Sequence, residues 1–468
     1  MLSPLTITFI IAIYFSILIL ISKITSKNSS DEAFFIGERQ SPWYIVAYGM
    51  IGATLSGITF LSVPGWVSVT EFFYMQMVLG YVPGYLFVAY VLLPVYYKMR
   101  LYSIYGYLKD RFGYYSHKCG AGYFFLSRLL GASLRLYLVA LVLQSLLFDQ
   151  IGVPFIITTL ITISLIWLYT YKGGIKTIIW TDTLQTTFML FTLIICIYMI
   201  FQDLGYSSIR DSINQSNLSL DLFSFTDFNH SSNFFRSFFA GMFIAIAMTG
   251  LDQDMMQKNL SCKTLGEAQK NMVFFSVVLV FVNILFLYLG ALLYQYASFN
   301  NILTSGDNLF VDVVKEGELG VVVFVLFLLG LISAAYSSAD SALTSLTTCV
   351  CVDFLSLDKH GSNAQKFSKR TLVHIFLSFL LFCIILIVEY LNNDSIISTL
   401  FLLASFTYGP LLGLFMFGLF TKRKIIDKYV PIIVVLAPVL SYVLYVYDVK
   451  ILNGFDFGPD LIIINGCS

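Results

Sequence analysis

The sequence predicts an all-α polytopic membrane protein, and three observations lead to that fold class. Of its 468 residues, 58% are hydrophobic and 12% are charged, whereas soluble domains average about 25% charged residues. The apolar residues gather in segments long enough to cross a bilayer. Basic residues concentrate in alternate loops between these segments, as the positive-inside rule requires.

Twelve apolar segments are long enough to span a membrane. Their expected limits are 5–22, 43–69, 72–97, 119–148, 152–170, 174–201, 235–257, 270–297, 319–352, 371–391, 396–420 and 428–447. After the last one, the apolar run 461–464 indicates either the first turns of a thirteenth span or a short segment at the membrane edge.

The basic residues orient these spans. No basic residue precedes the first segment, whereas Lys23 and Lys27 follow it, so we expect a retained helix with the N-terminus outside. Alternation then makes the loops 23–39, 98–118, 172–176, 258–270, 359–370 and 422–428 cytoplasmic, and these loops hold most Lys and Arg residues. The exceptions are Arg210, Arg236, Lys315 and Lys450 outside, and Arg128 and Arg135 within a span.

Cysteine and histidine point to no special chemistry. The seven cysteines are odd in number and lie mostly in apolar segments, which argues against a disulfide framework. The four histidines are scattered, and no Cys/His cluster indicates a metal site. We also find no nucleophile–base pair in the spans, so an enzyme is not expected.

Two spans contain breaks at matching positions. Gly52–Gly57 in the second and Ala247–Gln253 in the seventh place glycines and polar residues where helix interiors disfavour them. The two spans lie five helices apart and cross in opposite directions. Such a pair points to an inverted-repeat transporter, although a glycine helix contact explains either break alone.

A polar stripe runs along the ninth span. At helical spacing, one face carries Ala334, Ser337, Ser338, Ser341, Ser345 and Thr348, with Asp340 beside it. A carboxylate inside a membrane costs about 2.5–3.5 kcal/mol. A small hard cation with oxygen ligands would compensate. The alternative is that these hydroxyls are packing groups bonded to their own helix.

With these features the chain resembles the sodium/solute symporter family, above all its bacterial sialic acid and organic-anion members. The resemblance rests on Phe34–Arg39, Pro42-Trp43, Ser56–Phe60, Pro64-Gly65, Gly173–Lys176, Trp180–Asp182, Gln185, Asp252-Gln253, Gln257, Leu260-Ser261 and Ser337-Ser338. It implies a LeuT-like 5+5 inverted-repeat core with one extra N-terminal helix and one or two C-terminal helices. The implied divisions are 1–42, a core at 43–421 with repeats 43–201 and 235–421, and 422–468.

The resemblance also implies ion sites. A common Na⁺ site would take backbone carbonyls of Gly52, Leu55 and Ala334 with the hydroxyls of Ser337 and Ser338. A possible second Na⁺ site would take Asp182, Asp340 and Ser341. Asp340 stands where that site has a hydroxyl, so the two carboxylates can hold Na⁺, share a proton, pair with Arg135 or be structural.

The implied solute site lies beside the first break, and its expected residues are Ser56, Thr59, Tyr74, Gln76, Arg135, Met248 and Thr249. Ile58 and Thr59 replace the amide or acidic groups of sugar transporters, whereas Ser56, Thr59 and Arg135 match the carboxylate-binding groups of sialic acid symporters. Arg135 can also be structural. A buried arginine fork suits a carboxylate.

The expected function is therefore Na⁺-coupled import of a small, carboxylate-bearing solute such as sialic acid by alternating access. A sugar or polyol symporter and a non-transporting sensor of the same fold are the alternatives. The expected partners are Na⁺, the solute and the lipid bilayer, with no nucleic acid. We expect a monomer, spanning a bacterial cytoplasmic membrane many times.

Overall fold

A computed structural model describes residues 3–27, 30–215, 218–219, 221–225, 227–317, 319–357, 363–391, 396–451, 455 and 457–467. The named elements in these ranges are all helices. The first half contains α1 (Pro4–Thr25), α2 (Asp31–Ile36), α3 (Trp43–Thr54), α4 (Gly57–Thr70), α5 (Tyr74–Phe87), α6 (Leu93–Met99), α7 (Gly106–Arg111), α8 (Tyr114–Leu143), α9 (Phe155–Thr170), α10 (Ile175–Asp203) and α11 (Ile209–Asn214). The second contains α12 (Phe234–Ala245), α13 (Gln253–Leu260), α14 (Leu265–Phe299), α15 (Leu309–Glu316), α16 (Gly320–Cys349), α17 (Asn363–Leu391), α18 (Ile396–Phe420), α19 (Val430–Ile451) and α20 (Leu461–Cys467).

The helices confirm the predicted spans. In the described part of the chain, nine helices are long and apolar enough to cross a membrane, or eleven if each of two bent pairs counts as one span. The remaining predicted segment is α9, a shorter apolar helix of 16 residues. The helices α8 and α17 begin before the expected limits, because their first turns carry His117, Lys118 and other polar residues that a hydropathy window excludes.

Both predicted breaks are present. The pair α3 and α4 bends by 56° at Leu55 and Ser56, and α12 and α13 bend by 65° after a π-helical turn at Ile246–Gly250. Asp252 starts α13, because its carboxylate accepts the Asp254 N–H at 2.9 Å. The carbonyls released at this second break find hydroxyl donors, since Tyr96 donates to Gly250 O and Tyr105 to Leu251 O, both at 2.9 Å.

Glycines bring the first broken helix against its neighbour α10. A Cβ on Gly49 would lie 3.0 Å from Cβ of Asp182, and one on Gly52 would lie 2.1 Å from Oγ1 of Thr186. No side chain larger than hydrogen fits at Gly52 without moving α10. The same device joins α5 to α12, where a Cβ on Gly241 would meet Met77 O at 2.1 Å.

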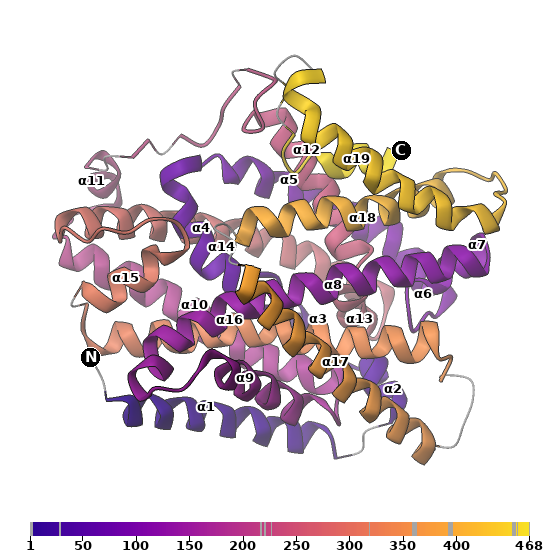
Figure 1. Cartoon of the computed structure of the whole chain (residues 1–468), viewed down its shortest axis with the longest axis horizontal. Helices are drawn as coiled ribbons and strands as arrows, with labels where there is room; N and C mark the ends of the chain where they lie inside the picture. Colours follow the sequence, from indigo (N-terminus) through magenta and orange to yellow (C-terminus); the bar gives the residue numbers. More distant parts are fainter. Residues whose placement is uncertain are drawn as a thin grey trace.

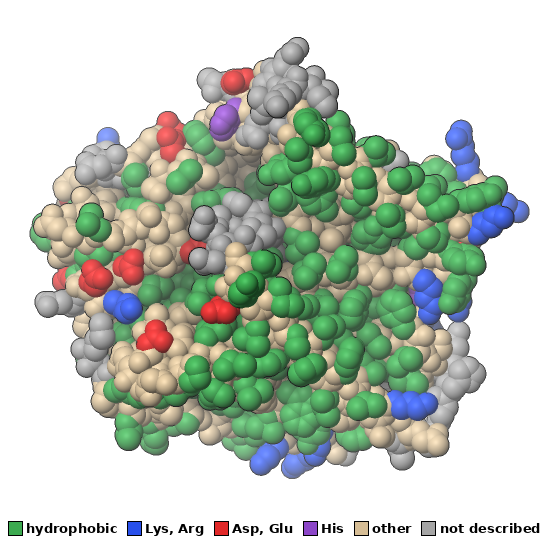
Figure 2. Space-filling model, viewed as in Figure 1, with side chains coloured by type: hydrophobic (Ala, Val, Ile, Leu, Met, Phe, Trp, Pro, Cys, Tyr) green, Lys and Arg blue, Asp and Glu red, His purple; other side chains and the backbone are tan. Residues whose placement is uncertain are grey.

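Acidic and basic side chains are unevenly distributed over the face drawn in Figure 2. In Figure 1, α8, α16 and α18 run roughly along the horizontal axis, while α17 crosses them obliquely. On the face drawn in Figure 2, the acidic side chains lie mainly to the left and top, near the N-terminus. Most basic side chains lie to the right and along the lower edge, and a broad apolar surface separates the two groups.

The last helix packs on α18. Asn465 Nδ2 donates to the carbonyls of Ser405 at 2.8 Å and Phe406 at 3.1 Å. Just before α20, Asp460 pairs with Arg236 at the start of α12, with 2.8 Å between Oδ2 and Nη2. Residues 461–467 therefore form the helical turns that the apolar run indicates, while 452–454 and 456 lie outside the described residues.

Candidate ion and solute site

The break between α3 and α4 lies against the polar stripe of α16. Ser338 Oγ donates to the carbonyl of Ala53 at 3.0 Å. Next to the break, a Cβ on Gly57 would lie 3.7 Å from Cβ of Ala335. The stripe and the break, which are about 280 residues apart in sequence, thus meet as expected.

The residues expected for the common Na⁺ site lie on the two elements that meet at this contact. Because α3 ends at Thr54, the carbonyls of its last turn, including that of Gly52, have no partner from a continuing helix. Gly52, Leu55, Ala334, Ser337 and Ser338 are all buried. Whereas two tyrosine hydroxyls bond the carbonyls at the second break, the Ala53 carbonyl here takes the Ser338 hydroxyl.

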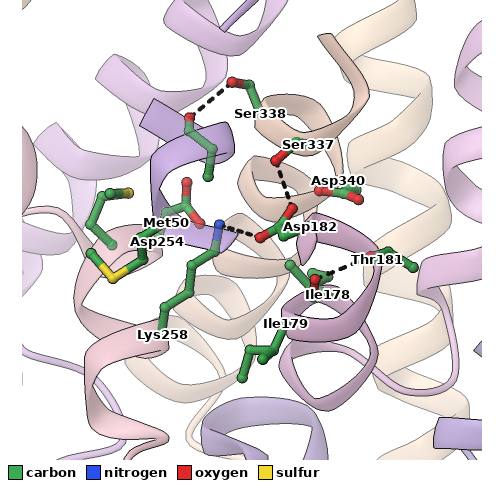
Figure 3. Close-up of polar contacts among 12 residues, drawn as sticks. Met50, Ile178, Ile179, Thr181, Asp182, Asp254, Lys258, Ser337, Ser338 and Asp340 are labelled. Atoms are coloured by element: carbon green, nitrogen blue, oxygen red, sulfur yellow. Dashed lines mark hydrogen bonds and ion pairs between the residues drawn. The ribbon is translucent and has the colours of Figure 1, made fainter. Parts of the chain in front are cut away.

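Ser337 is oriented by a buried ion pair. Its hydroxyl donates to Asp182 Oδ1 at 2.6 Å, and Asp182 Oδ2 lies 2.8 Å from the ammonium nitrogen of Lys258. Figure 3 shows Asp182 between Lys258 and Ser337. Because the carboxylate takes the hydroxyl proton, the lone pairs of Ser337 remain available to a cation.

Asp340 lies near this pair on α16. Its Oδ2 accepts the hydroxyl of Tyr169 at 2.9 Å, and it interacts electrostatically with Asp182 and Lys258. Its Oδ1 and the hydroxyl of Ser341 have no hydrogen-bond partner among the described residues. Of the alternatives for the two carboxylates, pairing with Arg135 is not found among the described residues, and the cation beside Asp182 is Lys258.

A cavity of about 110 Å³ opens beside the first break. Six of the seven expected solute residues line it: Ser56, Thr59, Tyr74, Arg135, Met248 and Thr249. Further lining residues that sequence reasoning missed include Tyr81, Tyr85, Arg128 and Asn283. The cavity is thus walled by α4, α5, α8, the π-helical turn after α12 and α14.

Gln76 requires a correction. It is fully buried, but its amide nitrogen donates to Ser232 O at 2.9 Å and its amide oxygen accepts the Ser224 N–H at 3.0 Å. Both polar atoms are therefore committed to the segment before α12, and Gln76 does not line the cavity. Helical spacing does not say whether Gln76 faces the cavity or the segment before α12, so the sequence alone could not place this side chain.

The two arginines of α8 differ in their partners. Arg128 forms an ion pair with Asp254, and its Nη1 lies 3.7 Å from Asp252 Oδ2. Tyr408 on α18 donates to the same Asp252 carboxylate. Arg135 lies about two turns further along α8. It forms no ion pair with the described residues, and its Nε has no hydrogen-bond partner among them. Arg135 thus has no direct ion-pair partner among the described residues, although Asp252 interacts with it electrostatically.

Sequence reasoning missed Lys258, which it placed in a cytoplasmic loop. The hydropathy of the seventh span ends at Gln257, whereas the helix α13 continues to Leu260 and is buried throughout. The signal was available: Asp254 and Lys258 stand four residues apart, so a helix continuing past the break carries both charges inward.

Broken spans that meet at a buried cluster of oxygen atoms beside a cavity define a secondary transporter of the inverted-repeat class. The sequence model of the sodium:solute symporter family matches residues 34–425. The chain belongs to that family, and it is a Na⁺-coupled solute importer of a multi-pass membrane type rather than an enzyme.

Individual relatives agree with this assignment. The chain is 27% identical to the sodium/sialic acid symporter NanT of Aliivibrio fischeri, covering 92% of this chain and 85% of that one. It is 25% identical to the sodium/sialic acid symporter SiaT of Proteus mirabilis, covering 91% and 87%.

A solved Na⁺-coupled sialic acid symporter in a substrate-bound outward-open state superimposes with a TM-score of 0.83 at 21% identity, covering 98% of this chain and 95% of that one. The nucleobase–cation symporter Mhp1 gives 0.54 at 15% identity, covering 94% and 92%. These structures establish the LeuT-like fold predicted from the sequence.

Proposed function

We propose that this symporter imports a small organic solute bearing a carboxylate, with N-acetylneuraminic acid as the first candidate. The observation that carries the proposal is Arg135, which lines the cavity and has no carboxylate partner among the described residues. Arg135 is half-buried, and a guanidinium fork at a cavity with no direct carboxylate partner favours an anionic solute that supplies one.

The cavity walls support the same substrate class. The hydroxyls of Ser56 and Thr59 line it at the break, opposite Met248 and Thr249. Hydroxyl donors and a planar guanidinium fork together suit a carboxylate. Tyr74 adds a further polar group for the rest of the solute. The names of the relatives from Aliivibrio fischeri and Proteus mirabilis, both sialic acid symporters, support this choice.

In the proposed cycle, Na⁺ binds first at the break. The carbonyls of Gly52, Leu55 and Ala334 and the hydroxyls of Ser337 and Ser338 are its ligands. A bound ion would link the break to α16 and order the adjacent hydroxyls of Ser56 and Thr59. A tenfold inward Na⁺ gradient then contributes about 1.4 kcal/mol to solute accumulation.

We further propose a single chain as the working unit, oriented in a bacterial cytoplasmic membrane with its N-terminus outside. The separation of acidic and basic side chains toward opposite ends supports the orientation.

The test is uptake of labelled N-acetylneuraminic acid into proteoliposomes under an inward Na⁺ gradient, with a choline gradient as the control. We expect accumulation only with Na⁺, and its loss in Arg135→Gln. Na⁺-dependent uptake of an uncharged sugar or polyol that survives Arg135→Gln would contradict the carboxylate proposal. Solute binding with no accumulation would instead identify a sensor.

A further inference from the structure

We infer that the ammonium group of Lys258 is a resident cation at Asp182, which takes the place of a second Na⁺ and leaves the symporter with one coupling ion. The inference rests on the proposed Na⁺ site at the break between α3 and α4, and it deepens that proposal by fixing the number of ions.

The geometry of Asp182 carries the argument. Its Oδ2 lies 2.8 Å from Lys258 Nζ, and its Oδ1 accepts the Ser337 hydroxyl at 2.6 Å. Both oxygens are therefore engaged by the protein itself. The side chains of Asp182 and Lys258 are each 1% exposed, so water offers the pair no alternative partners.

Charge explains why a cation must stay at this position. Asp182 lies about two turns inside the start of α10, a membrane-spanning helix, and its side chain is buried, so an unpaired carboxylate there is strongly unfavourable. Na⁺ and the lysine ammonium both carry one positive charge, and either satisfies the carboxylate. The ammonium differs in one respect: its covalent tether prevents release, so it cannot be carried across the membrane.

Asp340 and its neighbours on α16 do not form a second Na⁺ site without Asp182. Oδ2 of Asp340 accepts from Tyr169, whereas its Oδ1 and the hydroxyls of Ser341 and Thr344 lack partners among the described residues. These three oxygen atoms of α16 are fewer than the five proposed at the break. A Na⁺ placed there would also be repelled by the Lys258 ammonium, which interacts with Asp340.

The ion pair of Lys258 and Asp182 is also connected to the proposed Na⁺ site through Ser337. Lys258 holds Asp182, and Asp182 accepts the hydroxyl proton of Ser337, which leaves the lone pairs of that hydroxyl available to a cation. Lys258 belongs to α13, the second half of the other broken helix. It is therefore a positioning residue that connects the two broken helices through α10 and α16.

The test counts bound ions rather than activity. Purified protein is titrated with ²²Na⁺ at constant ionic strength, with choline chloride as the replacement salt. We expect one Na⁺ bound per wild-type chain and one in Lys258→Arg, which keeps the charge. In Lys258→Met, which has a similar volume, the freed Asp182 oxygen joins Asp340 and Ser341, and we expect two Na⁺ per chain. The double variant Lys258→Met/Asp182→Asn should return to one.

Each other result has a definite meaning. Two Na⁺ bound to the wild type would overturn the inference, most directly if Asp340→Asn reduced the count to one. A count of one in Lys258→Met would overturn it as well, because the lysine would then not be standing in for an ion. If Lys258→Met does not fold even in NaCl, the wild-type count decides alone. No Na⁺ bound to the wild type would instead contradict the proposed Na⁺ site.

Discussion

Ser338 is the hydroxyl that joins α16 to the first helix break, through its hydrogen bond to Ala53 O at 3.0 Å. As a proposed Na⁺ ligand it should be sensitive to removal of a single oxygen. We expect Ser338→Ala to raise the Na⁺ concentration for half-maximal uptake about tenfold, or about 1.4 kcal/mol. Ser345 is a matched control, since it is equally buried on α16 but donates only to Ala342 of its own helix. An equal effect of Ser345→Ala would indicate a packing role for the whole stripe.

Arg135 is the residue on which solute selectivity should depend. Loss of charge-assisted hydrogen bonds of about 1.5–3 kcal/mol predicts a 10- to 100-fold rise in the solute dissociation constant for Arg135→Gln. Arg135→Lys keeps the charge without the planar fork and should give an intermediate value. Isothermal titration calorimetry in saturating NaCl measures both variants. Unchanged affinity in Arg135→Gln would assign this arginine a structural role.

Individual residues also mark the limit of prediction from the sequence. The stripe of α16 and the hydroxyls near the break could be predicted because helical spacing fixes which residues share a face. The side chains that these residues contact on other helices could not be predicted from spacing, because spacing does not say which residue lies opposite. Asp182 meets Lys258, a partner that was not among the alternatives drawn from the sequence, and Gln76 was expected in the cavity and instead holds the segment before α12.

Elements were more predictable than contacts. Each span is a long apolar run, and both breaks contain glycine and polar residues that destabilise helix at membrane depth. The exact ends were less accessible. The helix α8 starts at Tyr114 because a residue from a distant segment, Asp427, accepts the N–H groups of Tyr115 and Ser116 at 2.8 Å each. That acceptor cannot be inferred from the local sequence.

This cap leads to a prediction about α8 as an element. Asp427→Ala would leave the N-terminal N–H groups of α8 without their acceptor and remove a negative charge from the positive end of the helix. We expect a loss of about 1 kcal/mol in stability and a lower melting temperature in detergent. Asp427→Asn keeps one acceptor oxygen and should lose less. An unchanged melting temperature in Asp427→Ala would mean that water replaces the cap.

For the whole molecule, the number of coupling ions determines how membrane potential acts on transport. One Na⁺ moving with a monocarboxylate transfers no net charge, so only the chemical gradient of Na⁺ contributes. We therefore expect that a valinomycin-imposed potential, negative inside, leaves the steady-state accumulation of N-acetylneuraminic acid unchanged in wild-type proteoliposomes. With two Na⁺ per solute, a potential of about 100 mV would add about 2.3 kcal/mol, or roughly 50-fold accumulation.

Because Lys258 pairs with Asp182, a single substitution of Lys258 should change how transport responds to membrane potential. In the wild type, the ammonium remains with Asp182 and carries no current. In Lys258→Met, a Na⁺ bound to the freed carboxylate would travel with the solute, and transport would then move one positive charge per cycle. We expect this variant to respond to the imposed potential while Lys258→Arg does not. A potential-sensitive wild type that transports the same anion would show that a second ion already moves, and it would return Asp340 and Ser341 to the coupling mechanism.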